Sequence, residues 1–142
     1  MIRQRVLTFI GIVAAVLLGV GFGLSRTIGG VPDAPVATCD DPIEWHRAGE
    51  VVGERAAIAG PVAAGSFATD VGGEPTFLNL GNAHPDPERF DVVIYPDVRD
   101  RFDEPPEDAL QGVDVCVQGE VRDRDGVPQI VLDNRAMLQE RP

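Results

Sequence analysis

The sequence predicts an all-β domain built as a small closed barrel. Two short apolar runs, Thr76–Leu80 and Phe90–Tyr95, lie close together, and the second is rich in β-branched and aromatic residues. Neither run is long enough for an ordinary helix, so both are interpreted as half-buried strands. Further along, the pair Asp125-Gly126 separates two valine-rich runs, which is typical of a tight β-hairpin.

The N-terminus is predicted to be a membrane anchor. Val6–Ser25 is 20 residues long without a charge, enough to cross a bilayer as one helix. Arg3 and Arg5 precede it, so the positive-inside rule places the N-terminus in the cytoplasm and the remainder outside. We therefore expect residues 1–26 to be a single-pass anchor in the cell membrane, with an extracytoplasmic domain and the membrane as a partner through residues 6–25.

The anchor is followed by a predicted linker and then the folded unit. Residues 27–38 carry two glycines, two prolines and small residues, as linkers do, and residues 39–142 are expected to form the domain. Two alternatives stay open for the N-terminus: a cleaved secretory signal, and lipidation at Cys39. All three interpretations place the domain outside the cytoplasm.

The domain is expected to open with a short helix over Asp41–Gly49. Asp41 would be the N-cap, Pro42 would occupy the first helical position, and Gly49 would end the helix. Trp45, the one tryptophan, is expected to pack against an end of the barrel rather than to stack on a ligand.

The remaining elements follow in order. Glu54–Phe67 is predicted to be a long first strand bent at Gly60-Pro61, since glycine and proline inside a strand mark bulges and bends. The polar segment after Tyr95 contains Pro105-Pro106, which favours a short helical turn. Val113–Arg122 and Val127–Leu132 give two more strands, and Arg135–Arg141 a terminal helical turn.

This order is strand, strand, strand, helix, strand, strand. It predicts the five-stranded Greek-key barrel called the OB-fold, with its helix between strands three and four.

The two cysteines are expected to pair. Cys39 precedes the first helix and Cys116 lies in the fourth strand, and disulfides persist in extracytoplasmic domains. A bridge across so long a loop would add on the order of 4 kcal/mol to stability. The alternatives are two buried thiols, or a lipidated Cys39 beside a free Cys116.

The charge of the domain argues against a polyanionic ligand. Residues 33–142 hold all 23 acidic residues and nine of the 12 arginines, and the chain has no lysine, so the domain carries a formal charge of −14. Such a domain repels polyanions at long range, because binding them depends on basic side chains that neutralise phosphates.

No catalytic apparatus or metal site is recognisable in the sequence. His46 and His84 are the only histidines and belong to no cluster of ligands, and Ser25 and Ser66 are in no triad setting. The acidic residues around Asp97–Asp108 are interpreted as a solvated face. We therefore predict a non-enzyme without a cofactor or metal.

Several motifs resemble a known family. The most specific is the strand Phe77-Leu78-Asn79-Leu80-Gly81; the others are Gly60-Pro61-Val62, Phe90-x-Val92-Val93-Ile94, Val115-Cys116-Val117-x-Gly119 and Gly126-x-Pro128-x-Ile130. Over roughly residues 43–138 the chain resembles bacterial exported OB-fold domains of the nucleic-acid-binding type, found alone or beside secreted thermonuclease-like domains. The catalytic arginine and glutamate set of the thermonucleases is not matched.

The resemblance implies a ligand face on strands two and three. It places Phe77, Asn79, Phe90 and Tyr95 there. The simpler interpretation puts Phe77 and Phe90 in the core and gives Asn79 a hydrogen bond to a neighbouring loop.

Four arginines form the expected basic patch near the strand ends: Arg99, Arg101, Arg122 and Arg124. Neighbouring aspartates largely cancel it, so any binding of single-stranded nucleic acid is expected to be weak and salt-sensitive. The candidate ligand-binding residues are Phe77, Asn79, Tyr95, Arg99 and Arg101. The predicted function is a non-catalytic, membrane-anchored binding module for nucleic acid; the alternative is a module that binds a protein of the cell envelope.

Overall fold

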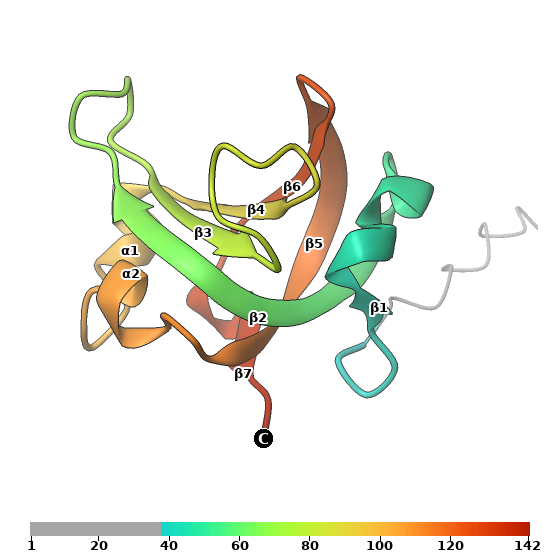
Figure 1. Cartoon of the computed structure of the whole chain (residues 1–142). Helices are drawn as coiled ribbons and strands as arrows, with labels where there is room; N and C mark the ends of the chain where they lie inside the picture. Colours follow the sequence, from blue (N-terminus) through green and yellow to red (C-terminus); the bar gives the residue numbers. More distant parts are fainter. Residues whose placement is uncertain (1–37) are drawn as a thin grey trace, which may run out of the picture. The chain divides into compact units, whose positions relative to one another are not determined.

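The computed structural model of the chain describes residues 38–142 (Figure 1). The predicted membrane anchor, with its apolar run Val6–Ser25, and all but the last residue of the predicted linker lie outside these residues. Among the helices of residues 38–142, none has the length and apolar character needed to cross a membrane.

Five strands form a closed barrel in which β2 pairs with β3, β3 with β4, β4 with β6, β6 with β5, and β5 again with β2. All of these pairs are antiparallel except β4 with β6, which is parallel. This arrangement is consistent with the predicted OB-fold. The strands are β2 (Arg55–Phe67), β3 (Thr76–Leu80), β4 (Phe90–Ile94), β5 (Asp114–Arg124) and β6 (Val127–Val131).

The long strand β2 is shared by both halves of the barrel, as its glycine and proline predicted. Its first part, Arg55–Pro61, pairs with β5, and its second part, Val62–Phe67, pairs with β3. The register shifts between Val62 and Ala64, immediately after Gly60-Pro61. The bend lets one strand cross the front of the barrel from β5 to β3 (Figure 1).

Short elements are added at the ends of the barrel. Two one-turn helices stand between β4 and β5, where one short helix was expected: α1 (Pro96–Arg99) and α2 (Pro106–Ala109). The chain ends with the 3₁₀ turn η2 (Arg135–Met137), as predicted, and then with β7 (Leu138–Glu140), an unpredicted strand that pairs with β5.

The predicted start of the first helix is wrong. Asp41 does not cap a helix; instead β1 (Ile43–Glu44) pairs in parallel with Ile58 and Ala59 of β2, and the 3₁₀ helix η1 (Trp45–Val51) follows. The pairing with β2 holds Ile43 and Glu44 extended, so the helix begins at Trp45, three residues later than its capping signal indicates.

Trp45 closes one end of the barrel, as expected. Its ring lies on the backbone of two glycines: a Cβ added at Gly60 would lie 2.4 Å from the ring, and one added at Gly81 2.2 Å. Within the barrel, Phe90 is fully buried among the branched aliphatic side chains of all five strands. These side chains form one continuous hydrophobic core inside the barrel.

The predicted disulfide is confirmed. Cys39 and Cys116 are bonded, with Cα atoms 5.9 Å apart and a sequence separation of 77. Cys116 lies on the outer side of β5 and is fully buried, together with Ala57 and Ala59 of β2, against Cys39. The bridge thus fixes the N-terminal segment over the outer face of β2 and β5.

A candidate ligand-binding groove on the outer face of β3, β4 and β6

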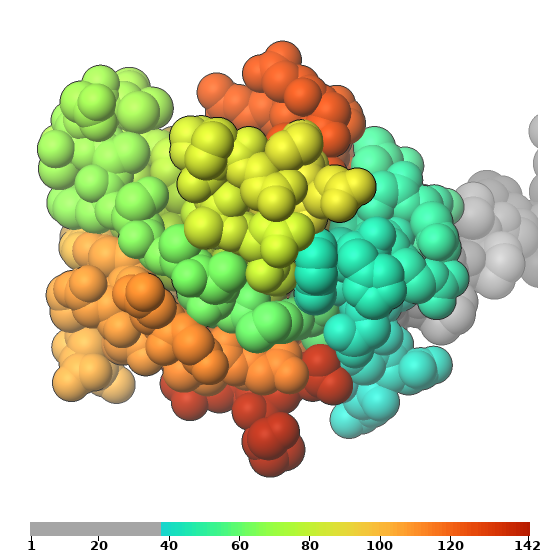
Figure 2. Space-filling model, in the orientation of Figure 1, coloured from blue at the N-terminus to red at the C-terminus, as the bar shows by residue number. Residues whose placement is uncertain are grey.

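A groove of about 560 Å³ lies on the outer face of β3, β4 and β6. Three connections surround it: the β2–β3 loop, the β3–β4 loop and the β5–β6 hairpin, which project from the same side of the barrel (Figure 1). In the space-filling view the surface is hollowed between the green β2–β3 loop and the yellow β3–β4 loop (Figure 2). We call this feature the strand groove; its floor consists of Phe77, Asn79, Asp91 and Gln129.

The strand register sets the floor. Asn79 on β3 is opposite Asp91 on β4, and Asp91 is opposite Gln129 on β6, so the three side chains form one polar row across the sheet. All three are nearly buried, with exposed fractions of 5%, 6% and 9%. Buried polar side chains need partners, so the row is either internally bonded or ready to bond a ligand.

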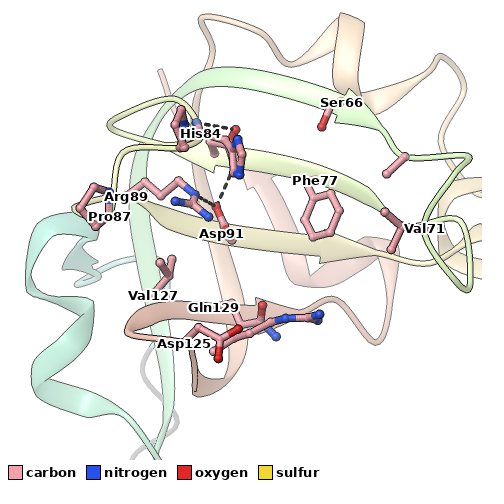
Figure 3. A pocket seen from close by; sticks show the side chains of 14 residues that line it. Ser66, Val71, Phe77, His84, Pro87, Arg89, Asp91, Asp125, Val127 and Gln129 are labelled. Carbon is pink, nitrogen blue, oxygen red and sulfur yellow. Dashed lines mark hydrogen bonds and ion pairs between the residues drawn. The ribbon is translucent and has the colours of Figure 1, made fainter.

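Part of the row is internally bonded (Figure 3). The Asn79 amide donates to Asp91 Oδ1 at 2.7 Å, Arg89 Nε donates to the same oxygen at 2.9 Å, and the backbone N–H of His84 donates to Asn79 Oδ1 at 3.3 Å. The predicted hydrogen bond between Asn79 and a neighbouring loop is confirmed, with the His84 N–H as donor and Asn79 Oδ1 as acceptor.

The other polar atoms of the row have no protein partner. Within residues 38–142, Asp91 Oδ2 and the Gln129 side-chain amide make no hydrogen bond, and neither is enclosed away from solvent. The floor therefore presents one carboxylate oxygen and one primary amide to whatever enters the groove.

The aromatic ring of Phe77 lies beside this polar row (Figure 3). Phe77 is half-buried and faces the groove, opposite Ser66 on β2 and Val93 on β4. Assigning Phe77 to the core is therefore wrong, whereas Phe90 is a core residue as predicted. Together with Val71, Phe77 makes the apolar end of the groove.

The walls of the groove are held in place by their own hydrogen bonds. In the β3–β4 loop, Asn82 donates to the Glu88 carbonyl, the Glu88 N–H donates to Asp86, and Arg89 Nη1 donates to the Asp86 carbonyl at 2.7 Å. In the β5–β6 hairpin, Asp125 and Gly126 both adopt positive φ, as the predicted tight turn requires. A groove with fixed walls loses little entropy when a ligand binds.

The other predicted site residues lie elsewhere. Tyr95 packs against Gly73 in the β2–β3 loop and supports that wall from outside. Arg99 pairs with Glu107 at 2.5 Å and lies 4.2 Å above the ring of Phe67, and Arg101 is exposed after α1. None of the three lines the strand groove.

The predicted basic patch is not assembled as a unit. Arg122 pairs with Glu120, and this hydrogen bond lowers the pKa of Glu120. Only Arg124 of the patch lines the groove, together with Arg89, which sequence reasoning missed. The two arginines are matched by Asp91 and Asp125, so the charges of these four side chains cancel.

The residues that sequence reasoning missed had a detectable signal. Asp91 is a charged residue inside an apolar run, and Gln129 is a polar residue in another. Their adjacency depends on the parallel pairing of β4 and β6, which sequence patterns do not reveal. No group of three or more metal-ligating side chains in residues 38–142 is placed to hold a metal ion.

Comparisons with known proteins include a distant structural likeness. No protein-family profile matches the chain, and no curated protein matches it. The solved structure of asparaginyl-tRNA synthetase from Pyrococcus horikoshii is 17% identical, with a TM-score of 0.47. The matched region covers 70% of this chain and 22% of the synthetase chain.

Proposed function

We propose that the domain is a non-catalytic binding module and that the strand groove holds a short stretch of single-stranded nucleic acid. One observation carries the proposal: a half-exposed aromatic ring, Phe77, lies beside a row of polar groups with free hydrogen-bonding atoms. Barrels of this architecture bind oligonucleotides on the corresponding strands. The family resemblance of the strand around Asn79 supports the same ligand class.

Each part of the groove has a role in this proposal. A base stacks on Phe77, an interaction that contributes about 1–3 kcal/mol per base. Asp91 Oδ2 accepts a hydrogen bond from an N–H group on a base edge, such as N3–H of thymine, and the Gln129 amide bonds a further base edge. Arg124, on the hairpin at the rim, contacts a phosphate.

The charge of the domain makes this binding depend on bases more than on phosphates. Two arginines line the groove, and Arg89 is already paired with Asp91 at 2.9 Å. Each phosphate neutralised on a single strand contributes about −0.7 to the slope of log K against log salt. The slope is therefore no steeper than about −1.4, and stacking supplies most of the affinity.

The location of the domain is part of the same proposal. The uncharged run Val6–Ser25, with arginines before it, supports a single-pass anchor with the domain on the extracytoplasmic side. The Cys39–Cys116 disulfide supports an oxidising compartment. We propose that the groove acts at the outer surface of the cell membrane.

A second candidate ligand is an extended protein segment of the cell envelope. The formal charge of −14 on residues 33–142 favours it, because an acidic surface attracts basic polypeptides and repels polynucleotides. The apolar side chains Val71, Pro85 and Pro87 in the groove walls suit such a segment as well as they suit a base.

Titration of the full chain with a fluorescent octadeoxythymidylate at low and moderate salt tests the proposal. We expect saturable binding with a salt slope between 0 and about −1.4. Binding of a basic peptide under the same conditions, with none of the oligonucleotide, would favour the protein ligand. Absence of oligonucleotide binding even at low salt would contradict the nucleic-acid proposal.

A further inference from the structure

A second, smaller hollow of about 310 Å³ lies next to the strand groove. It is lined by Trp45 and His46 of η1, by Pro128 of β6, and by part of the β3–β4 loop. We call it the tryptophan hollow. The two hollows share Pro87 and Arg89, so they adjoin at these two residues, which we call the ridge. In Figure 2 the yellow β3–β4 loop meets the teal η1 at this place.

The tryptophan hollow has an aromatic wall that is held rigidly. One face of the Trp45 ring lies against Gly60 and Gly81, where even a methyl group would collide with it. The remaining surface of Trp45 is partly exposed, and the exposed ring of His46 stands edge-on to it, with ring centroids 5.5 Å apart. A rigid aromatic surface facing a proline is suited to hold a planar ring.

The ridge offers a hydrogen-bond donor to a nucleic-acid strand that crosses it. Arg89 uses Nε for Asp91 and Nη1 for the Asp86 carbonyl, which fixes the guanidinium in place. Within residues 38–142, Nη2 makes no hydrogen bond, and it is not enclosed away from solvent. Figure 3 shows Pro87 and Arg89 between the strand groove and η1. A phosphate crossing the ridge finds a preoriented donor there.

We propose that the tryptophan hollow is a second base-binding subsite for the same single strand. One nucleotide stacks on Phe77 in the strand groove, the connecting phosphate crosses the ridge at Arg89, and a following nucleotide packs between Trp45 and Pro128. This inference rests on the proposed function and adds to it a minimum ligand length of two nucleotides.

The test uses the fluorescence of Trp45, the only tryptophan of the full chain. The full chain, in mild detergent, is titrated with oligodeoxythymidylates of one, two, four and eight nucleotides, and binding is followed both by calorimetry and by Trp45 emission. We expect affinity to rise by about tenfold or more from one nucleotide to two or more, because a second base then stacks. We expect Trp45 emission to be quenched by the longer ligands.

Two substitutions of exposed side chains distinguish binding at the tryptophan hollow from binding at the strand groove. His46→Ala removes one wall of the tryptophan hollow and is expected to weaken binding of the longer oligonucleotides by about threefold to tenfold, leaving the mononucleotide unchanged. Val52→Ala is the matched control, since Val52 is exposed near the same helix and lines neither hollow. It should change nothing.

The outcomes distinguish the two proposals. Binding of equal affinity at all lengths, or saturation by calorimetry with Trp45 emission unchanged, overturns the second subsite and leaves the strand groove as the binding site. An equal loss of affinity for oligonucleotides of every length in the His46→Ala variant also overturns the second subsite. Failure of every oligonucleotide to bind overturns the proposed function and the second subsite together.

Discussion

The barrel has two outer faces that are built in opposite ways. The face of β2 and β5 carries small residues, Ala57, Ala59 and Cys116, and the segment around Cys39 is bonded covalently over it. The face of β3, β4 and β6 carries a polar row and an aromatic ring, with loops standing around it and nothing within residues 38–142 lying over it.

This difference shows which face is structural and which is available for binding. Small apolar side chains there lie under a disulfide-linked cover, so that face contributes to stability. Asp91 and Gln129 on the other face keep free polar atoms at the floor of a groove, an arrangement that costs stability unless a ligand or water bonds them. Five substitutions test this division.

Loss of the disulfide should have the largest effect on stability. Cys39→Ser removes a cross-link across 77 residues, and we expect it to lower the free energy of unfolding by about 4 kcal/mol in chemical denaturation. The wild-type chain in reductant should behave in the same way. Affinity for octadeoxythymidylate should stay within about twofold, since the cover lies on the other face. A tenfold loss of affinity in the folded variant would show that the two faces are coupled.

Removal of the Asp91 carboxylate should have the next largest effect. Asp91→Ala leaves the nearly buried Arg89 and Asn79 without their partner, and we expect a loss of about 3 kcal/mol in the free energy of unfolding. Asp125→Asn is the control, because Asp125 is an exposed carboxylate at the rim of the same groove without an ion pair in residues 38–142, and asparagine tolerates its positive φ. Equal stability of the two variants would mean that the polar row is not an internally bonded unit.

Phe77→Ala should act mainly on binding. Loss of the stacking surface should weaken octadeoxythymidylate binding by about 1–3 kcal/mol in a fluorescence titration. Phe67→Ala removes a ring of the same type from outside the groove, where it lies under Arg99, and should leave affinity unchanged. If the two variants lose the same affinity, the strand groove is not the stacking site.

Gly60→Ala should destabilise the barrel through Trp45 alone. The added methyl group would collide with the ring at 2.4 Å, and we expect a loss of about 1–3 kcal/mol in thermal or chemical unfolding. Gly72→Ala, where the added methyl group meets open space, should be close to neutral. A neutral Gly60→Ala would mean that Trp45 is free to move away from the barrel.

Loss of an exposed ion pair should have the smallest effect. The hydrogen bond from Arg122 lowers the pKa of Glu120 in the folded protein. Any stabilisation by this ion pair is therefore present above the pKa of Glu120 in the unfolded chain, and it is lost as the pH falls through the pKa of Glu120 in the folded protein. Because both side chains are solvent-exposed, Glu120→Gln should leave the pH dependence of unfolding unchanged. A clear change between pH 3 and pH 6 would contradict this.

The strands and the disulfide could be predicted from the sequence because their signals are local. Alternating valines, an Asp-Gly turn and a strand interrupted by Gly60-Pro61 are each sufficient for their own element. The start of η1 could not be predicted, since the pairing of Ile43 with β2 overrides the capping signal of Asp41.

The floor of the groove was less accessible to sequence reasoning. Phe77 and Asn79 were identified, but their neighbours Asp91 and Gln129 come from β4 and β6, whose register decides the contact, and Arg89 comes from the β3–β4 loop. Arg99 was assigned to a ligand as part of a basic patch expected near the strand ends; in the fold it pairs with Glu107, eight residues away.

Hydrogen exchange of the full chain tests most directly which face binds. Deuterium uptake would be compared with and without saturating octadeoxythymidylate. The account predicts slower exchange in the β2–β3 loop (residues 68–75) and the β3–β4 loop (residues 82–89), with no change in residues 96–112 or near Cys39. Protection confined to residues 96–112 or to the Cys39 segment would contradict it.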